Sequence, residues 1–377
     1  MNKISLELQT VSKNKAGIGN YTYNIAKCLA KNNKYKYIGE LFNILGKNDT
    51  DIVKELNIEI KENKWFWYKL YDRYREYVNI KYNKIIGTNS DIYTFFNFHI
   101  PKNIDGKVIV VIHDMIPILF PEVCTYAKKK EEYIPSVENS DVIVTVSESA
   151  KRDIISLFDV DPKKIRIISP GIYLEECRKK YSHEELENTR KKYSLPNKFL
   201  MYLGTLEPRK GVDKLILAFN MLKEKGNSDI KLVIAGGKGW MYNKIFDLYE
   251  NSKYKKDIIF TGYVDEKDKI KLYKLAEAFV FPTLYEGFGM PVLESMASGT
   301  PVVASNNSSI PEVTGDAGIL INRDSVEDLC EGMEKILGDE ELRKELIKRG
   351  IKQSEKFKWE DSAKKYEDIY EELLKGR

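Results

Sequence analysis

Two glutamates flank a glycine-containing turn in the segment Glu286-Gly-Phe-Gly-Met-Pro-Val-Leu-Glu294, and their types and spacing suit ligand binding. The apolar run at 278–281 predicts a buried strand before the turn, and Pro291 suits the first position of a helix after it. Gly287 and Gly289 let backbone N–H groups at the positive end of a helix dipole approach a polar or anionic ligand. Glu286 in the turn and Glu294 in the first helical turn could each hold a vicinal diol, one on a sugar and one on a ribose. An N-capped structural helix is the alternative, but it requires neither two glycines nor a second glutamate.

A second charged element is the loop Gly204-Thr-Leu-Glu-Pro-Arg-Lys-Gly211, which precedes an amphipathic helical pattern. Arg209 and Lys210 stand at the start of that helix, where cations oppose the helix dipole. An anionic ligand removes the conflict, because a diphosphate would gain charge-assisted hydrogen bonds worth about 1.5 to 3 kcal/mol each. A solvated basic turn is the alternative reading.

Two further candidates lie in the first half of the chain. His113 follows the apolar run 108–112, so it stands at a predicted strand end. A lone histidine is more often structural, but ligands bind at the carboxyl ends of parallel strands. Gly19, within Ala16-Gly-Ile-Gly-Asn20, could let phosphates or an acceptor approach a helix start. Tight helix packing explains this glycine almost as well.

These candidates need a scaffold that brings strand ends together, and the chain shows the same pattern twice. Short apolar runs alternate with helix-length segments, which predicts doubly wound parallel sheets covered on both faces. The expected strands are 4–8, 37–42, 92–96, 108–112, 142–146 and 165–168, then 199–203, 232–235, 258–260, 278–281, 302–304 and 319–321.

Two α/β domains are therefore predicted, an acceptor-side domain over 1–180 and a donor-binding domain over 190–357, facing each other across a cleft. The charged stretch at about 170–196 is the expected linker. The helix within 359–377 follows a complete second domain, so it could pack back onto the first.

Composition narrows the class of protein. The chain has 377 residues, 42% of them hydrophobic and 31% charged, as in soluble globular proteins. Its net charge of +4 is a small difference between 61 basic and 57 acidic residues, so it gives no reason to expect nucleic-acid binding. The 4 cysteines match no metal-ligand spacing and favour a reducing compartment. No long apolar run and no signal-peptide core are present, which predicts a cytoplasmic protein.

Together these motifs resemble the family 4 retaining glycosyltransferases with the GT-B fold. The resemblance rests on the Glu-x7-Glu segment, the Gly-Thr-x-Glu-Pro-Arg-Lys-Gly loop, His113-Asp114, Thr145-Val-Ser-Glu-Ser149 and Gly17-Ile-Gly19, in the expected order over nearly the whole chain. Within the family, the sequence is most similar to bacterial mannosyltransferases that build O-antigen and other surface polysaccharides.

The resemblance implies a role for each candidate residue. It implies that Glu294 binds the ribose hydroxyls and that Glu286 binds hydroxyls of the donor sugar, with backbone contacts to the sugar from Gly287, Phe288, Gly289 and Met290. It also implies that Arg209 and Lys210 bind the diphosphate and that the backbone of Val264 contacts the base. His113 would lie near the transferred sugar. Many relatives carry an arginine where this chain has Thr205, so phosphate binding must depend more on Arg209, Lys210 and helix termini.

The implied reaction is transfer of a hexose with retention, most simply mannose from GDP-mannose, onto a saccharide or lipid-linked glycan. No Asp-x-Asp motif stands where a sugar-binding metal would be expected, so no metal and no resident cofactor are predicted. A UDP-sugar donor, glucose or N-acetylglucosamine, is the alternative, and a catalytically silent nucleotide-sugar-binding subunit is another. A dehydrogenase is disfavoured, because the third glycine of its fingerprint is missing.

The acceptor is harder to read from the sequence. The aromatic stretch 65–77 has apolar residues at helical spacing, which favours a packed amphipathic helix. Its surplus aromatic residues could instead contact a sugar chain or the inner face of the cytoplasmic membrane, where a lipid-linked acceptor would be presented.

Overall fold

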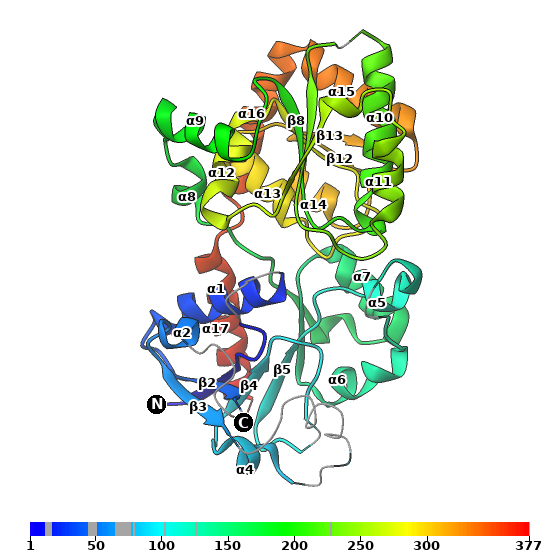
Figure 1. The fold of residues 1–377 in the computed structure, drawn as a ribbon. Coiled ribbons are helices and arrows are strands. Elements are labelled where there is room, and N and C mark those ends of the chain that lie inside the picture. Colours follow the sequence, from blue (N-terminus) through cyan, green and yellow to red (C-terminus); the bar gives the residue numbers. More distant parts are fainter. Residues whose placement is uncertain are drawn as a thin grey trace. The chain divides into compact units, whose positions relative to one another are not determined.

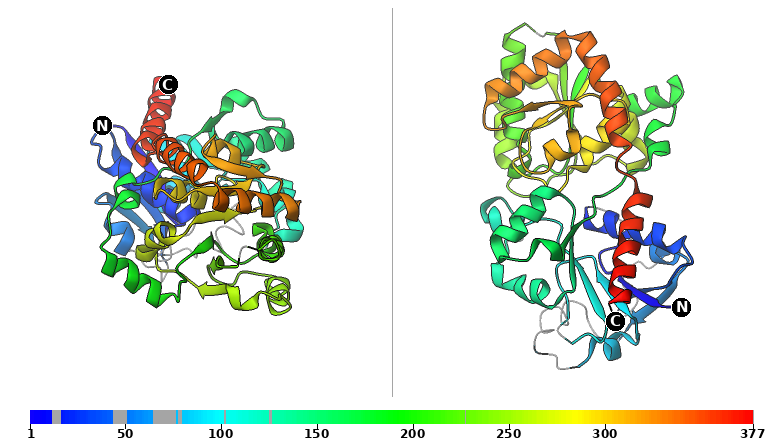
Figure 2. Two further views of the ribbon diagram at one scale, coloured as in Figure 1. Left: turned by 90° about the horizontal axis from the view of Figure 1, so that it is seen from above. Right: turned by 180° about the vertical axis from the view of Figure 1, so that it is seen from behind.

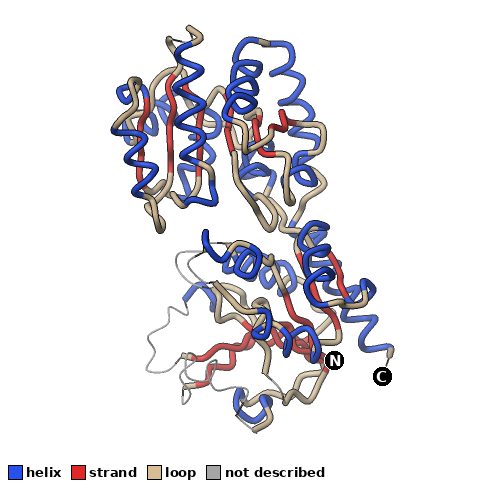
Figure 3. The backbone as a smooth tube through the Cα atoms, turned by 90° about the vertical axis from the view of Figure 1, so that its right-hand side faces the viewer, coloured by secondary structure: helices blue, strands red, loops and turns tan. Residues whose placement is uncertain are grey.

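The computed structural model describes residues 1–11, 17–43, 51–64, 77, 80–101, 103–124, 127–226 and 228–376. The chain divides into two compact units. Unit 1 comprises Met1–Ile118, Lys128–Gly171 and Trp359–Arg377, and unit 2 comprises Leu119–Ala127 and Ile172–Lys358. In each unit the strands form a central layer between helices (Figure 3).

Unit 1 contains a parallel seven-stranded sheet in the order β3-β2-β1-β4-β5-β6-β7. Its strands are β1 Lys3–Glu7, β2 Lys36–Phe42, β3 Glu59–Asn63, β4 Ile92–Phe95, β5 Lys107–Val111, β6 Val142–Thr145 and β7 Ile165–Ile167. The central strands are buried along almost their whole length, because helices cover both faces of the sheet.

The helices of unit 1 lie on both faces of this sheet (Figure 1). They are α1 Ile18–Ala30, α2 Asp51–Lys54, α4 Tyr82–Ile86, α5 Ile116–Leu119, which ends at the first residue of unit 2, α6 Ile134–Asn139, α7 Glu148–Phe158 and α17 Trp359–Lys375, with the short 3-10 turns η3 Lys130–Glu132 and η4 Pro162–Lys164. The last helix, α17, packs beside α1 near the start of the chain (Figure 2).

Unit 2 contains a parallel six-stranded sheet in the order β10-β9-β8-β11-β12-β13, which is the doubly wound order 3-2-1-4-5-6. Its strands are β8 Phe199–Leu203, β9 Lys231–Ala235, β10 Ile258–Gly262, β11 Ala278–Phe281, β12 Val302–Ser305 and β13 Gly318–Ile321. Its helices are α8 Leu174–Arg178, α9 His183–Lys192, α10 Val212–Glu224, α11 Asn243–Glu250, α12 Glu266–Leu275, α13 Met290–Ala297, α14 Ile310–Thr314, α15 Val326–Gly338 and α16 Glu340–Ser354, with 3-10 turns η2 Pro121–Val123, η5 Pro208–Lys210 and η6 Lys255–Asp257.

The predicted α/β class with two doubly wound sheets is confirmed, and every expected strand is present within one or two residues of its predicted bounds. Among the described residues, one strand was not expected. β3, with the sequence Glu-Ile-Lys-Glu-Asn, lies at the edge of its sheet and is mostly only partly buried, so it needs no apolar run.

The boundaries between the two units differ from the domain boundaries predicted from the sequence. Residues 172–196, expected mainly as a linker, carry α8 and α9 within unit 2. The amide of Ile172 donates to the carbonyl of Phe357 at 3.0 Å, which joins the two ends of the longer segment of unit 2, Ile172–Lys358. Helix α17 belongs to unit 1.

Candidate functional site

The loops after β8 and β11 meet because of the strand order in unit 2. β8 and β11 are neighbours at the point where the order of strands reverses, and ligands bind there in doubly wound sheets. The amide of Leu284 donates to the carbonyl of Arg209 at 2.7 Å, and Arg209 Nη1 donates to the carbonyl of Tyr285 at 2.6 Å. The two charged motifs of the sequence are thus joined by one backbone–backbone and one side-chain–backbone hydrogen bond.

One oxygen of Glu286 is surrounded by donors. Its Oε1 atom accepts from Lys210 Nζ at 2.6 Å, Thr283 Oγ1 at 2.8 Å and Arg209 Nη1 at 3.1 Å. Burial alone would raise the pKa of Glu286, but the nearby charges of Lys210 and Arg209 lower it to about 2. Glu286 is therefore an anion at neutral pH, and none of these three hydrogen bonds uses its Oε2 atom.

Protein carboxylates partly neutralise the two cations of the loop. Arg209 Nη2 donates to Glu207 Oε1 at 2.6 Å, in addition to its contact with Glu286. The side chain of Lys210 is only 13% exposed, and burial lowers its pKa. The conflict of these cations with the dipole of α10 is thus reduced within the protein itself, and both cations remain beside the start of that helix.

The loop after β8 requires a glycine at its end. Gly211 has a φ of 69°, and a Cβ atom there would lie 2.0 Å from the carbonyl oxygen of Pro282. This close approach of the two loops fixes the backbone on which Arg209 and Lys210 are carried.

Two serines hold the glutamate turn from its other side. Ser308 Oγ accepts from the amide of Glu286 at 3.1 Å. Ser309 Oγ lies 2.9 Å from the carbonyl oxygen of Glu286 and 2.7 Å from that of Phe288. The turn is therefore anchored by hydrogen bonds before any ligand binds.

Helix α13 begins one residue earlier than expected. Gly289 caps it with a φ of 105°, so Met290 is already helical and Pro291 is the second helical residue. Glu294 consequently lies in the second turn and not in the first, as the position of Pro291 had suggested.

Glu294 is held by the neighbouring helix α12. Its Oε1 atom accepts from Lys269 Nζ at 2.6 Å, and its Oε2 atom accepts from Tyr273 Oη at 3.2 Å. Burial opposes the charge on Lys269, but Glu294 and Glu266 raise the pKa of Lys269 above its ordinary value. Glu294 is 9% exposed, and its carboxylate is oriented through both of its oxygens.

Val264 lies just before α12, the helix whose Lys269 and Tyr273 bond Glu294. The preceding Gly262 accepts a hydrogen bond from the amide of Gly236 at 2.8 Å, which ties the end of β10 to the end of β9. Val264 is 7% exposed, and Asp265 caps α12. Lys269 and Tyr273, the fourth and eighth residues of α12, bond the Glu294 carboxylate, so this carboxylate lies along the helix that Val264 precedes.

In unit 1, His113 stands just after β5, as its position in the sequence predicted. Its Nε2 atom lies 3.1 Å from the carbonyl oxygen of Phe96, which can only accept, so Nε2 carries the proton. Burial lowers the pKa of His113 to about 4. The imidazole is therefore neutral at pH 7, with Nδ1 as a hydrogen-bond acceptor.

Gly19 is the second residue of α1, and its environment requires a small residue. A Cβ atom at Gly19 would lie 2.5 Å from the carbonyl oxygen of Thr10. Close packing of the helix start against the backbone of Thr10 and Val11 is therefore sufficient to explain this glycine.

The structure brings Arg209, Lys210 and Glu286 into direct contact. Glu294 and Val264 are both next to helix α12, and all five residues belong to unit 2. His113 and Gly19 belong to unit 1. Sequence reasoning assigned no role to the partners that orient these groups, which are Glu207, Thr283, Ser308, Ser309, Lys269 and Tyr273. Only Glu207 carried a signal, since it lies in the same loop as the cations.

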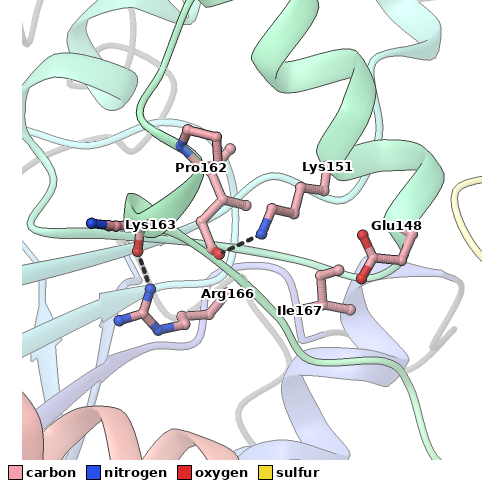
Figure 4. A pocket seen from close by; sticks show the side chains of 7 residues that line it. Glu148, Lys151, Pro162, Lys163, Arg166 and Ile167 are labelled. Atoms are coloured by element: carbon pink, nitrogen blue, oxygen red, sulfur yellow. Dashed lines mark hydrogen bonds between the residues drawn. The ribbon is translucent and has the colours of Figure 1, made fainter.

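A surface hollow in unit 1 lies beside the edge strand β7 (Figure 4). It is lined by Glu148, Lys151, Pro162, Lys163, Ile165, Arg166 and Ile167. Lys151 donates to the carbonyl of Ile165 at 3.3 Å, and Arg166 donates to the carbonyl of Lys163. These cations satisfy backbone carbonyls at the sheet edge, an arrangement that discourages pairing with another strand.

The helix predicted over the aromatic stretch 65–77 falls outside the described residues, apart from Tyr77. Among the helices formed by the described residues, none combines the length and apolar character needed to cross a lipid bilayer.

Two family models match consecutive parts of the chain. Residues 16–176 match the model of Glycosyltransferase Family 4, and residues 185–353 match that of Glycosyl transferases group 1. The two matches cover both halves of the chain.

Curated relatives agree with these models. The serotype-specific mannosyltransferase WbdA of Escherichia coli is 34% identical over 282 residues, which cover 73% of this chain and 34% of that protein. This chain thus spans about a third of the length of that relative. The O-antigen chain mannosyltransferase B of Escherichia coli is 31% identical over 288 residues, covering 75% of this chain and 74% of that protein.

A solved structure shows that the fold is shared. The crystal structure of a glycosyltransferase from Rickettsia africae ESF-5 has a TM-score of 0.76 at 19% identity, covering 100% of this chain and 99% of that chain. This likeness confirms the expected GT-B class of two Rossmann-like units.

Proposed function

This chain belongs to the glycosyltransferases of Family 4 and group 1, and from this premise we propose that it moves a hexose from a nucleotide-sugar to a saccharide or lipid-linked glycan acceptor, with retention of configuration. We favour mannose from GDP-mannose, in the synthesis of a cell-surface polysaccharide, because the relatives named above are mannosyltransferases. The observation that carries the proposal is the contact between Arg209, Lys210 and Glu286 at the switch point of the unit 2 sheet.

The charges of this cluster suit a diphosphate that carries a sugar. Arg209 and Lys210 would bind the diphosphate oxygens, and the start of α10 adds the positive end of its dipole. Glu286 would accept sugar hydroxyls at Oε2, since its other oxygen is already occupied by three donors.

The nucleoside would extend from this cluster toward α12. Glu294 would accept the two ribose hydroxyls through the lone pairs not used by Lys269 and Tyr273. The backbone at Val264 would then meet the base. A carboxylate already oriented by two partners loses little entropy on binding, which favours a rigid ribose site.

The chemistry follows from where charge develops. The bond between the anomeric carbon and the diphosphate oxygen breaks, and its electron pair stays on the diphosphate. The acceptor hydroxyl oxygen forms the new bond on the same face of the sugar, and its proton passes to the leaving phosphate. Arg209 and Lys210 stabilise the negative charge that grows on the diphosphate, which is where fixed cations accelerate a reaction most.

His113 acts on the transferred sugar and not as an obligatory base. Its Nε2 proton is committed to the carbonyl of Phe96, so Nδ1 accepts a hydrogen bond from a sugar hydroxyl. A neutral imidazole also avoids placing a cation beside the oxocarbenium-like sugar. Replacing His113 by alanine should lower kcat more than donor affinity, and normal turnover of that variant would refute this role.

A thermal-shift panel with GDP-mannose, UDP-glucose, UDP-N-acetylglucosamine and ADP-glucose tests the donor. We expect GDP-mannose to raise Tm most, and a larger shift with a UDP-sugar would replace mannose by that donor. A donor-hydrolysis assay with and without EDTA then tests turnover, and an unchanged rate in EDTA is expected. Binding without turnover would favour a silent subunit, and no shift with any donor would reject the nucleotide-sugar site.

Flotation with liposomes tests a peripheral contact with the inner face of the membrane. Binding that requires anionic lipid and is lost when the aromatic residues of 65–77 are changed would support a membrane-presented acceptor. Protein that stays at the bottom of the gradient with every lipid mixture would argue for a freely diffusing acceptor.

A further inference from the structure

We propose that Tyr21 is a positioning residue for His113, and that the C-terminal helix α17 holds Tyr21 through Tyr366. The proposal rests on the function proposed above for His113. All the contacts involved lie within unit 1.

Tyr21 and the backbone of Phe96 confine the imidazole of His113 from two directions. The rings of Tyr21 and His113 are perpendicular, with centroids 5.0 Å apart, which is a favourable edge-to-face geometry. Phe96 binds Nε2 through its carbonyl, and its own ring packs edge-on against Tyr21 with centroids 6.3 Å apart. One neighbour thus fixes the tautomer, and the other fixes the plane of the ring.

The hydroxyl of Tyr21 fixes the Tyr21 ring in turn. It donates to the carbonyl of Ile168 at 3.0 Å, and it lies 3.1 Å from the hydroxyl of Tyr366. Because a phenol has one proton, Tyr366 must be the donor in that second bond. Tyr21 is 3% exposed and Tyr366 is fully buried, so water cannot replace either partner without opening the core.

Helix α17, at the C-terminal end of the chain, supplies two residues that contact Tyr21, which are Trp359 and Tyr366. Trp359 packs edge-on against Tyr21 with centroids 5.9 Å apart, and Tyr366 follows it by seven residues, on the same face of the helix. The position of α17 beside α1 makes these contacts possible (Figure 2). A purely packing role would need only the ring of Tyr21, whereas the chain of hydroxyls specifies its orientation.

Histidine NMR gives a readout that is independent of the donor. The chain has 3 histidines, so ¹⁵N-labelled imidazoles are few, and a His113→Ala variant assigns the signal. In the wild type we expect the Nε2–H tautomer of His113 and a titration near pH 4. In Tyr21→Leu the imidazole loses the contact that fixes its plane, so its bond to the carbonyl of Phe96 should weaken. We therefore expect mixed tautomers and a pKa that moves toward the ordinary value of about 6.5. Tyr21→Phe and Tyr366→Phe keep the rings, so they should shift the His113 signal less than Tyr21→Leu does. These two variants test the proposal if Tyr21→Leu does not fold.

Tyr370→Phe is the matched control. Tyr370 is fully buried one turn further along α17, and its hydroxyl lies 3.1 Å from the hydroxyl of Thr94. We expect this variant to leave the His113 signal unchanged. An unchanged tautomer and pKa in Tyr21→Leu, or an equal effect of Tyr366→Phe and Tyr370→Phe, would overturn the proposal.

Turnover separates this inference from the proposed function. With the donor that the thermal-shift panel selects, Tyr21→Leu should lower kcat roughly 10- to 100-fold, as expected for a displaced catalytic group, with KM for the donor within about twofold. If His113→Ala turns over normally, the proposed role of His113 fails, whatever the NMR result. If His113→Ala is impaired but Tyr21→Leu keeps the wild-type kcat, only the positioning role fails.

Discussion

Among single residues, Lys210 carries two interactions at once, since its ammonium group neutralises Glu286 and would bind the diphosphate. We expect Lys210→Ala to weaken GDP-mannose binding roughly 10- to 100-fold, the value of one or two charge-assisted hydrogen bonds. Isothermal titration calorimetry measures this change. Lys198→Ala is the control, because Lys198 pairs with Asp229 at 2.9 Å on the exposed surface of the same unit. Equal affinities in the two variants would remove Lys210 from the donor site.

The pKa of His113 makes a prediction about stability. In the folded protein this pKa is about 4, whereas the ordinary value is 6.5. Between these pH values the unfolded chain binds a proton at His113 and the folded chain does not, so a falling pH favours unfolding. The Tm of the wild type should therefore fall more steeply from pH 6.5 to 4 than that of His113→Gln. Parallel Tm curves in scanning calorimetry would contradict the lowered pKa.

Between elements, the contact of the loops after β8 and β11 depends on Gly211. A side chain there meets both an unfavourable φ and the carbonyl of Pro282. We expect Gly211→Ala to lower Tm by several degrees and to weaken donor binding, because the loop that carries Arg209 and Lys210 must move. Gly226→Ala is a matched control, with a φ of 97° but no atom within 4 Å of the added Cβ. If the two variants lose the same stability and affinity, the close approach of the loops does not matter.

The elements also show what the sequence could reveal. The charged and glycine-containing motifs were recognisable because their residue types are unusual at strand ends, and consecutive apolar residues marked the buried strands. β3 was missed, because an edge strand needs no apolar run. The predicted start of α13 was wrong by one residue, because the residues next to Gly289 do not determine its left-handed backbone conformation. Partners such as Lys269 and Thr283 depend on which elements pack together, which no local pattern contains.

For the whole molecule, the division into two units predicts which unit each part of the donor should protect from hydrogen exchange. The residues proposed for the diphosphate and the ribose, Arg209, Lys210 and Glu294, all belong to unit 2. GDP alone should therefore slow amide hydrogen exchange in the loops 204–211 and 286–294 and leave the segment after β5 in unit 1 unchanged. A GDP-mannose analogue with fluorine at C2, whose transfer is slow because fluorine destabilises an oxocarbenium-like centre, adds the sugar.

With that analogue, further protection should appear around His113, since its Nδ1 atom is proposed to bind the sugar. Lys210→Ala and His113→Ala separate the two effects: the first should remove protection in unit 2 at a fixed ligand concentration, and the second only the added protection in unit 1. Mass spectrometry of peptides from the exchanged protein resolves the two units. Protection of unit 1 by GDP alone, or none in unit 2 with either ligand, would contradict the assignment of the donor's parts to these residues.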